Sequence, residues 1–295
     1  MRRTTTRIRE DRDSRLSRLA ARDPEWRTWI ALLETTVRVA AEGGWDDALS
    51  PLTDASSGRA APLLCRHEVH ADTDRLGRLL RSLAAILPGS AGLDRYDPSP
   101  LETLELVAAA VAQDWSAIAA VATRASVPDG ALATIAPLVS WPLLQACGRR
   151  LGPYIPADWG HGYCPVCGAW PLLAELRGLE RARRLRCGHC AADWPLPWLS
   201  CAYCGERRHE RLGSLVSEGQ LDGRKIETCT ECRGYLKSVS TLEPLTPAGV
   251  LLTDLETVEL DLVARERGWI RPDRPAYALD VRIVGAPGAA AERSL

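Results

Sequence analysis

Four Cys-x-x-Cys pairs between residues 164 and 232 constrain this 295-residue chain more than any other feature of its sequence. In each pair, the two-residue spacing lets one tight turn aim two thiolates at the same ion, and two such turns supply the four sulfurs of a closed tetrahedral site. The sequence therefore predicts two metal sites in a loop-rich region whose apolar core is thin enough to need them. The predicted metal ligands are Cys164, Cys167, Cys187, Cys190, Cys201, Cys204, Cys229 and Cys232.

The segments between the pairs indicate which turns share an ion. A hairpin-length segment separates the first pair from the second (residues 168–186) and the third from the fourth (residues 205–228), whereas a short stretch with two prolines lies between the second and third. Gly168 and Gly205 directly follow the first and third pairs, where glycine lets the backbone wrap beneath a metal. We predict a knuckle–hairpin–knuckle unit used twice, with two sequential sites, and an interleaved pairing is the alternative.

Ligation by four thiolates leaves no open coordination position, which is typical of structural rather than catalytic metal sites. Zinc and iron both accept four thiolates, so the spacing does not choose between these two ions. His189 and His209 lie near ligands in the sequence, but eight cysteines already fill two sites, and we interpret both as surface or neighbouring groups. We predict no catalytic residue, no enzyme activity and no cofactor beyond two metal ions.

Charge and hydropathy favour a cytoplasmic protein. The formal net charge of -1 gives no overall attraction to nucleic acid or to an anionic membrane. A highly charged stretch (residues 4–18) follows the Arg2-Arg3 pair, where an export signal needs an apolar one. No run reaches the roughly 18 apolar residues of a membrane span, so we predict none. In a reducing compartment clustered thiols are metal ligands more often than disulfides, and the isolated Cys65 and Cys147 are interpreted as small buried hydrophobic residues.

Helical periodicity dominates the first half of the chain. Apolar residues recur at a spacing of three and four from Glu25 to Ala41, and a second helix is expected from about Asp72 to Ile86. Ser99 and Glu102 have the spacing of a capping box at the start of a third helix. A further helix toward residue 150 contains two prolines and is expected to kink at them.

The chain is thus predicted to have an α+β fold in three parts. Residues 1–152 form an N-terminal bundle of five or six helices, and residues 153–242 form a tandem four-cysteine metal-binding domain of knuckle units. Residues 243–295 supply a C-terminal helix, from about residue 248 to residue 267, and a tail that pack on the rest. Gly268 is a natural end for that helix, and the tail beyond Gly285 is expected to be disordered.

The hairpin of the first unit is rich in arginine. Five arginines lie between Arg177 and Arg186, with Glu180 among them. Zinc ribbons often bind nucleic acid through such residues. Because this stretch is short and contains an acid, we interpret it as the solvated face of a hairpin.

Several segments of the cysteine-rich half resemble the formate dehydrogenase accessory protein family, FdhE. The similarity spans about residues 160–275. The cysteine pairs alone would fit many zinc ribbons, and their combination with the Tyr-Leu-Lys and Asp-Leu segments is much more specific. The segments that carry it are Cys164-Pro-Val-Cys-Gly168, Cys201-Ala-Tyr-Cys-Gly-Glu206, Glu227-Thr-Cys-Thr-Glu-Cys232, Tyr235-Leu-Lys237, Asp254-Leu-Glu-Thr-Val-Glu-Leu-Asp-Leu262 and Glu266-Arg-Gly-Trp269.

The resemblance implies a rubredoxin-like pair of sites that hold zinc or iron. It also implies a role in the cytoplasmic maturation of a molybdenum- or tungsten-dependent formate dehydrogenase, through contact with the catalytic subunit of that enzyme. Two alternative functions remain from the residues themselves: an iron electron-transfer protein and a nucleic-acid-binding zinc ribbon. Nucleic acid is not the expected partner, and a homodimer is left open.

Overall fold

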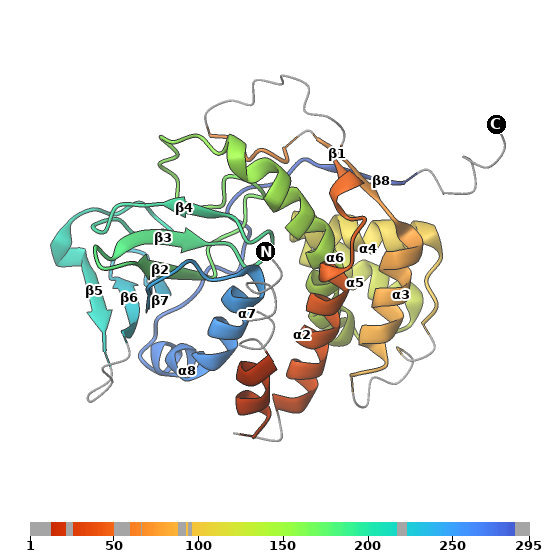
Figure 1. The fold of residues 1–295 in the computed structure, drawn as a ribbon, viewed down its shortest axis with the longest axis horizontal. Coiled ribbons are helices and arrows are strands. Elements are labelled where there is room, and N and C mark those ends of the chain that lie inside the picture. Colours follow the sequence, from red (N-terminus) through yellow and green to blue (C-terminus); the bar gives the residue numbers. More distant parts are fainter. Residues whose placement is uncertain are drawn as a thin grey trace.

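The computed structural model describes residues 13–21, 26–49, 60–65, 67–87, 93, 96–216 and 223–286. Most of its helices gather on one side, a six-stranded sheet lies on the other, and two more helices pack beneath the sheet (Figure 1). The α+β class is therefore confirmed, with helices first, two knuckle units next and helical segments after them. The predicted disordered tail beyond Gly285 falls, apart from residue 286, outside the described residues.

The first part of the fold is helical, as its periodicity predicts. Residues 13–21 form a helix, and the helices that follow are α2 (Trp26–Ala41), α3 (Thr73–Ala84), α4 (Pro100–Ala112), α5 (Trp115–Ala125) and α6 (Asp129–Leu151). The Asp72 side chain accepts a hydrogen bond from the backbone N–H of Arg75 and caps α3. Ser99 and Glu102 form the predicted capping box at α4, satisfying amide groups that the first helical turn leaves unpaired.

Helix α6 is the centre of the helical part, since it packs against α2, α3, α4 and α5. The two prolines predicted to kink it, Pro137 and Pro142, lie inside the helix and do not end it. Residues 130–154 are, by length and composition, the one described helical stretch that could cross a membrane. Its most apolar window is 67% buried within the fold, as in the core helix of a globular protein, so this stretch is weak evidence for a membrane span.

The sheet is built from two consecutive three-stranded units. Its strands are β2 (Leu173–Arg177), β3 (Ala182–Arg186), β4 (Asp193–Pro195), β5 (Leu212–Leu215), β6 (Arg224–Cys229) and β7 (Tyr235–Thr241). Their order is β4-β3-β2-β7-β6-β5. Within each unit all pairings are antiparallel, and the two units join where β2 and β7 pair in parallel. The first strand of one unit thus lies beside the last strand of the other, so the repeated hairpin of the sequence becomes one continuous sheet.

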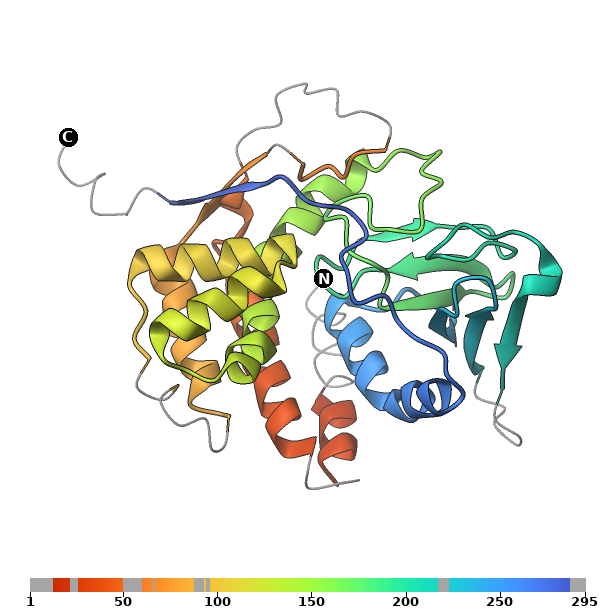
Figure 2. The same cartoon turned by 180° about the vertical axis from the view of Figure 1, so that it is seen from behind.

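The C-terminal part differs from the single helix that the sequence predicts. Two helices, α7 (Pro247–Glu256) and α8 (Val258–Glu266), meet at Thr257, whose φ of -118° interrupts the helical path. Gly268 follows α8 with a φ of +75°, as expected of a glycine that ends a helix. The last strand, β8 (Arg282–Gly285), then pairs in parallel with β1 (Glu68–Ala71) beside the helices, far from the main sheet (Figure 2).

Candidate metal centres

All four Cys-x-x-Cys pairs adopt the same turn. In each, the backbone N–H of the first cysteine donates a hydrogen bond to the carbonyl five residues later, over 2.8–3.0 Å. The residue after the second cysteine always has a positive φ: +70° at Gly168, +57° at Ala191, +73° at Gly205 and +59° at Arg233. Glycine at two of these positions therefore does not mark two kinds of turn, because alanine and arginine are held in the same left-handed conformation.

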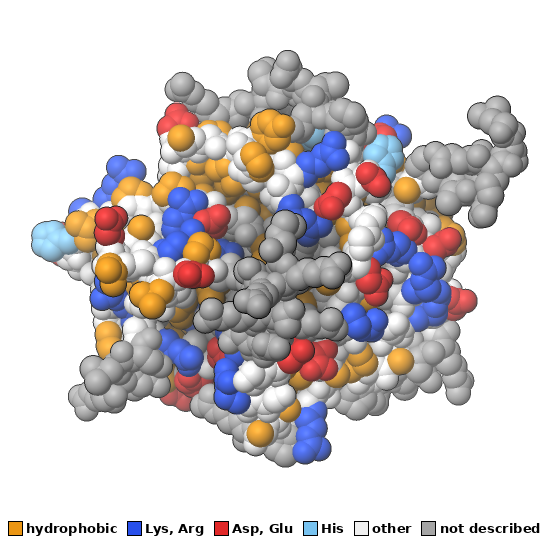
Figure 3. All heavy atoms as spheres, in the orientation of Figure 1, with side chains coloured by type: hydrophobic (Ala, Val, Ile, Leu, Met, Phe, Trp, Pro, Cys, Tyr) orange, Lys and Arg blue, Asp and Glu red, His pale blue; other side chains and the backbone are white. Residues whose placement is uncertain are grey.

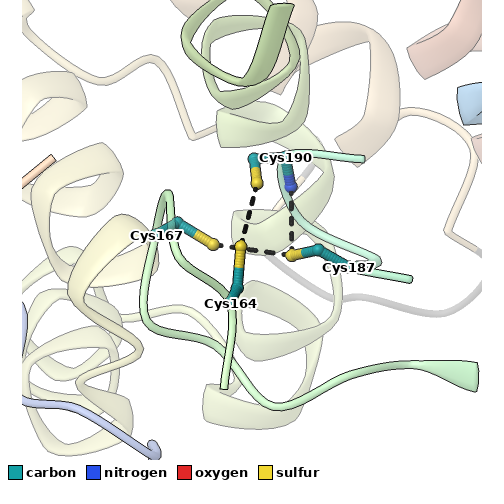
Figure 4. A group of neighbouring side chains, drawn as sticks. All are labelled: Cys164, Cys167, Cys187 and Cys190. Carbon is teal, nitrogen blue, oxygen red and sulfur yellow. Dashed lines mark hydrogen bonds between the residues drawn. The ribbon is translucent and has the colours of Figure 1, made fainter. Parts of the chain in front are cut away.

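The first group of cysteines combines the turns before β2 and after β3. The Sγ atoms of Cys164 and Cys190 lie 3.4 Å apart, those of Cys167 and Cys187 lie 3.5 Å apart, and all four lie within 4.8 Å of one another (Figure 4). All four residues are at most 1% exposed. Backbone N–H groups of Val166, His189 and Cys190 point at sulfurs over 3.4 Å, which favours thiolates at those positions.

Helix α6 covers the second turn of this group. Gly148 approaches so closely that a Cβ atom there would lie 1.9 Å from the carbonyl oxygen of Cys190. Trp141 Nε1 and Gln145 Nε2 each donate a 3.0 Å hydrogen bond to a carbonyl of the same turn. The first turn is held on its other side by residues 63 and 64, whose amides pair with carbonyls of residues 165 and 166. The first group therefore lies in the seam between the helices and the sheet.

The second group combines the turns before β5 and after β6. The Sγ atoms of Cys201 and Cys232 lie 3.7 Å apart, as do those of Cys204 and Cys229. This group is more open, because Cys204 is exposed and Cys232 is partly exposed. The structure thus brings the cysteines together in the sequential arrangement rather than in the interleaved one.

The donor sets fit a tetrahedral ion. Zinc–sulfur bonds of about 2.3 Å in tetrahedral geometry place sulfurs about 3.8 Å apart, close to the 3.4–3.7 Å separations of the paired cysteines. Burial raises the pKa of Cys164 and of Cys190 well above the usual thiol range, and it raises the pKa of Cys201 to about 11. Several thiolates this close need a cation among them, and four soft sulfurs suit zinc or iron.

The remaining cysteines and the two histidines stay outside both groups. The metal-binding clusters found among the described residues contain neither His189, Cys65 nor Cys147. Cys147 is buried, as predicted, and burial with the neighbouring Cys167 raises its pKa to about 12. Cys65 is only partly buried, with its Sγ 4.0 Å from the hydroxyl of Tyr277. His209 lies in the exposed one-turn helix η4 (His209–Arg211).

Two arginines of the first hairpin are buried in ion pairs and are not solvated. Arg186 and Arg183 are 4% and 6% exposed. Arg186 forms an ion pair with the fully buried Glu175, and Arg183 lies 2.7 Å from Glu227 of the second unit. Our interpretation of this stretch as a solvated hairpin face is therefore wrong for its two most buried arginines, because Arg186 meets a carboxylate of the neighbouring strand β2 and Arg183 meets one of β6 in the second unit.

A second buried charge network was missed by the sequence analysis. Lys237 is fully buried in β7, and its Nζ lies 2.7 Å from Asp254 Oδ1 and 2.6 Å from Asp261 Oδ2. Asp261 also accepts hydrogen bonds from Tyr235 and Arg271 at 2.8 Å each. These residues fix α7 and α8 to the sheet. Four of them, all except Arg271, stand in the Tyr-Leu-Lys and Asp-Leu segments of the family resemblance, and those segments were the available signal.

Comparisons with known proteins confirm the resemblance to FdhE. No family model matches the chain. A protein FdhE homolog of Aquifex aeolicus is 36% identical over 122 residues, covering 39% of this chain and 41% of that protein. A second homolog, of Stutzerimonas stutzeri, is 41% identical over 112 residues, covering 37% and 35%. Each match thus spans about two fifths or less of the relative's length.

Longer matches are weaker in identity. A protein FdhE homolog of Edwardsiella ictaluri is 27% identical over 240 residues, which are 76% of this chain and 71% of that protein. The crystal structure of the FdhE protein from Pseudomonas aeruginosa aligns with a TM-score of 0.60 at 24% identity, covering 91% of this chain and 94% of that one. The structural match shows that the two proteins share a fold across nearly the whole described chain.

Proposed function

We propose that this chain is an accessory protein that assists the maturation of a formate dehydrogenase by binding its catalytic subunit in the cytoplasm. The observation that carries this proposal is the likeness to FdhE proteins, which covers 39% of the chain in sequence and 91% of it in fold. In this proposal the chain has no enzyme activity of its own. Its function is to bind the catalytic subunit before the maturation of that subunit is complete.

We further propose that each group of four cysteines binds one ion, zinc or iron. Cys164, Cys167, Cys187 and Cys190 would hold the first, and Cys201, Cys204, Cys229 and Cys232 the second. A closed set of four sulfurs supplies a structural cross-link between chain segments, not an open position for substrate. The first ion would tie the turn that lies against α6 to the turn held by residues 63 and 64, and the second would tie the turns at the β5–β6 end of the sheet.

We propose a separate structural role for each of the three predicted regions. Residues 1–152 supply a helical body, residues 153–242 supply the metal-binding sheet, and residues 243–295 hold the two together. The buried Lys237 network joins this third region to the sheet, and the pairing of β8 with β1 joins it to the helical part, which supports this role.

An iron electron-transfer protein is the second candidate. One observation favours it: the exposed Cys204 would bring a redox-active iron at the second group to the surface, where electrons can pass to a partner. The nucleic-acid-binding alternative loses its main support, because Arg183 and Arg186 are buried in ion pairs.

Deletion of the gene tests the accessory role. We expect the deletion strain to make the catalytic subunit of formate dehydrogenase in normal amount but to oxidise formate poorly, and the wild-type gene to restore activity. The measurement pairs formate oxidation with subunit abundance by immunoblot. Normal formate oxidation in the deletion strain, with no second gene of this kind present, would reject the accessory role. A catalytic subunit that is fully active after purification, in a strain that fails to pass electrons from formate onward, would favour the iron electron carrier.

A further inference from the structure

A cavity of about 230 Å³ opens on the sheet beside the second cysteine group. Strands β5, β6 and β7 form its floor, and the loop of residues 198–203 forms a wall. Cys201 and Cys229 of the second group also line it. The cavity is smaller than the roughly 300–1,000 Å³ of typical small-molecule sites, so it suits one large side chain better than a whole cofactor.

The mouth of this cavity is apolar. Trp198 is 44% exposed and Leu199 is 60% exposed, and both line the cavity together with Leu212 of β5. Val216, directly after β5, is 61% exposed. Space-filling atoms show hydrophobic side chains mixed with basic and acidic ones over the end of the sheet that carries β5 (Figure 3). Such a grouping at a concave site is typical of a surface that binds another protein.

Two charged side chains that line the cavity lack, in the part of the chain that the structure describes, an ion-pair or hydrogen-bond partner for one of their polar atoms. Lys225 Nζ lies 4.6 Å above the ring of Trp198, and no carboxylate among the described residues lies within ion-pair distance of it. Glu227 uses Oε2 for Arg183, while its Oε1 is buried without a hydrogen-bond partner. Because Oε1 has no surface open to the cavity, the group available to an occupant is Lys225, which a carboxylate would satisfy.

The neighbouring sheet edge favours a peptide as that occupant. Strand β5 ends the six-stranded sheet and, within the described part of the chain, pairs only with β6. Its Leu212, Gly213 and Ser214 border the cavity. An unpaired strand edge offers backbone hydrogen bonds to an extended segment, and a pocket beside it can select a side chain of that segment.

We propose that this cavity binds an extended protein segment that presents one large apolar side chain next to an acidic residue. The apolar side chain enters between Trp198 and Leu199, and the carboxylate pairs with Lys225. The identification of this segment with the formate dehydrogenase catalytic subunit rests on the proposed function, but the chemistry of the cavity does not.

The first test uses the full metal-loaded chain and two synthetic probes, acetyl-Glu-Phe-Glu-Leu-amide and acetyl-Lys-Phe-Lys-Leu-amide. We expect calorimetric titration to give at least tenfold tighter binding of the acidic peptide. Lys225→Glu should reverse that preference, and Leu199→Asp should abolish binding. Leu242→Asp, at an exposed leucine outside the cavity, is the control. Circular dichroism and metal content verify that each variant is folded. Failure of the acidic peptide to bind, or unchanged binding by Lys225→Glu, overturns the proposal.

The second test repeats these measurements with the purified catalytic subunit. Loss of subunit binding in Lys225→Glu and Leu199→Asp, with the control unaffected, supports the cavity as the docking site. Equal binding by all variants rejects the cavity and leaves the proposed function intact. If the acidic peptide binds as expected and the wild-type chain fails to bind the subunit, the cavity stands and the proposed partner is wrong.

Discussion

The two cysteine groups are built from the same turn but placed in different surroundings. In the first, all four cysteines are buried where α6 meets the sheet. In the second, Cys204 is exposed and the group lies at the β5–β6 end of the sheet, beside an open cavity. The turn is local and follows from spacing, whereas burial depends on what the rest of the chain brings to it. The same motif thus forms a buried site between the helices and the sheet and a partly exposed site at the other end of that sheet.

The largest expected contrast comes from removing one ligand at each group. Cys164→Ser should release one of two ions and destabilise the fold on the order of 5 kcal/mol, a fraction of the roughly 10–16 kcal/mol that a structural zinc site supplies. Cys204→Ser should cost less than half as much, because its exposed position lets water complete the site. Metal analysis and thermal unfolding measure both. Equal losses of stability from the two changes would contradict the contrast.

A methyl group added where α6 contacts the turn of Cys190 should destabilise the first cysteine group and leave the second unaffected. Gly148→Ala places a Cβ 1.9 Å from the carbonyl oxygen of Cys190, so we expect a loss of about 1–3 kcal/mol through forced separation of α6 from the turn. Gly152→Ala is the matched control, because a Cβ there meets nothing within 4 Å. Denaturant unfolding gives the difference, and equal stability of the two variants would mean that α6 does not rest on the turn.

The exposed group should exchange its ion sooner. With a chromogenic chelator in excess, we expect two phases of metal release that differ by about tenfold in rate, because local opening is easier where fewer contacts cover the site. Cys204→Ser should make the fast phase faster and leave the slow phase unchanged. A single phase of release in the wild-type protein would indicate that the two groups open together.

The smallest effect concerns the left-handed residue in the first group. Ala191 has a φ of +57°, and glycine adopts this conformation at less cost. Ala191→Gly should therefore stabilise the fold by about 0.5 kcal/mol. Arg233→Gly in the second group should gain nothing, because Arg233 also stacks 4.6 Å from the ring of Trp269. Guanidinium midpoints compare the two variants, and a loss of stability in Ala191→Gly would show that its methyl group is needed for packing.

The parts of the fold set by neighbouring residues could be predicted from the sequence. The capping box at Ser99, the helix ends near Asp72 and Gly268, and the repeated hairpin all depend on residues within a few positions. The spacing of the cysteine pairs likewise predicted which turns meet.

What the sequence did not reveal depends on residues far apart in the chain. Arg183 looked solvated because its partner, Glu227, comes from the second unit, whereas Glu175, the partner of Arg186, lies in the neighbouring strand of the same hairpin. Nothing local distinguishes an arginine on a free hairpin from one covered by a later unit. The left-handed backbone of Ala191 was missed for a related reason, since the turn imposes it on a residue that does not prefer it.

Strand β8 pairs with β1 in the helical part, so the chain segment that forms the sheet is attached to the helices both before and after it. The chain enters the sheet from α6 and returns to the helical part through residues 271–281. The metal-binding region is therefore connected to the helical part on both its N-terminal and its C-terminal side. If the first ion is lost, the separated turns remain tethered within a few nanometres of α6, at a high effective concentration for each other. Reassembly after metal loss then becomes an encounter within one molecule, with a rate independent of protein concentration.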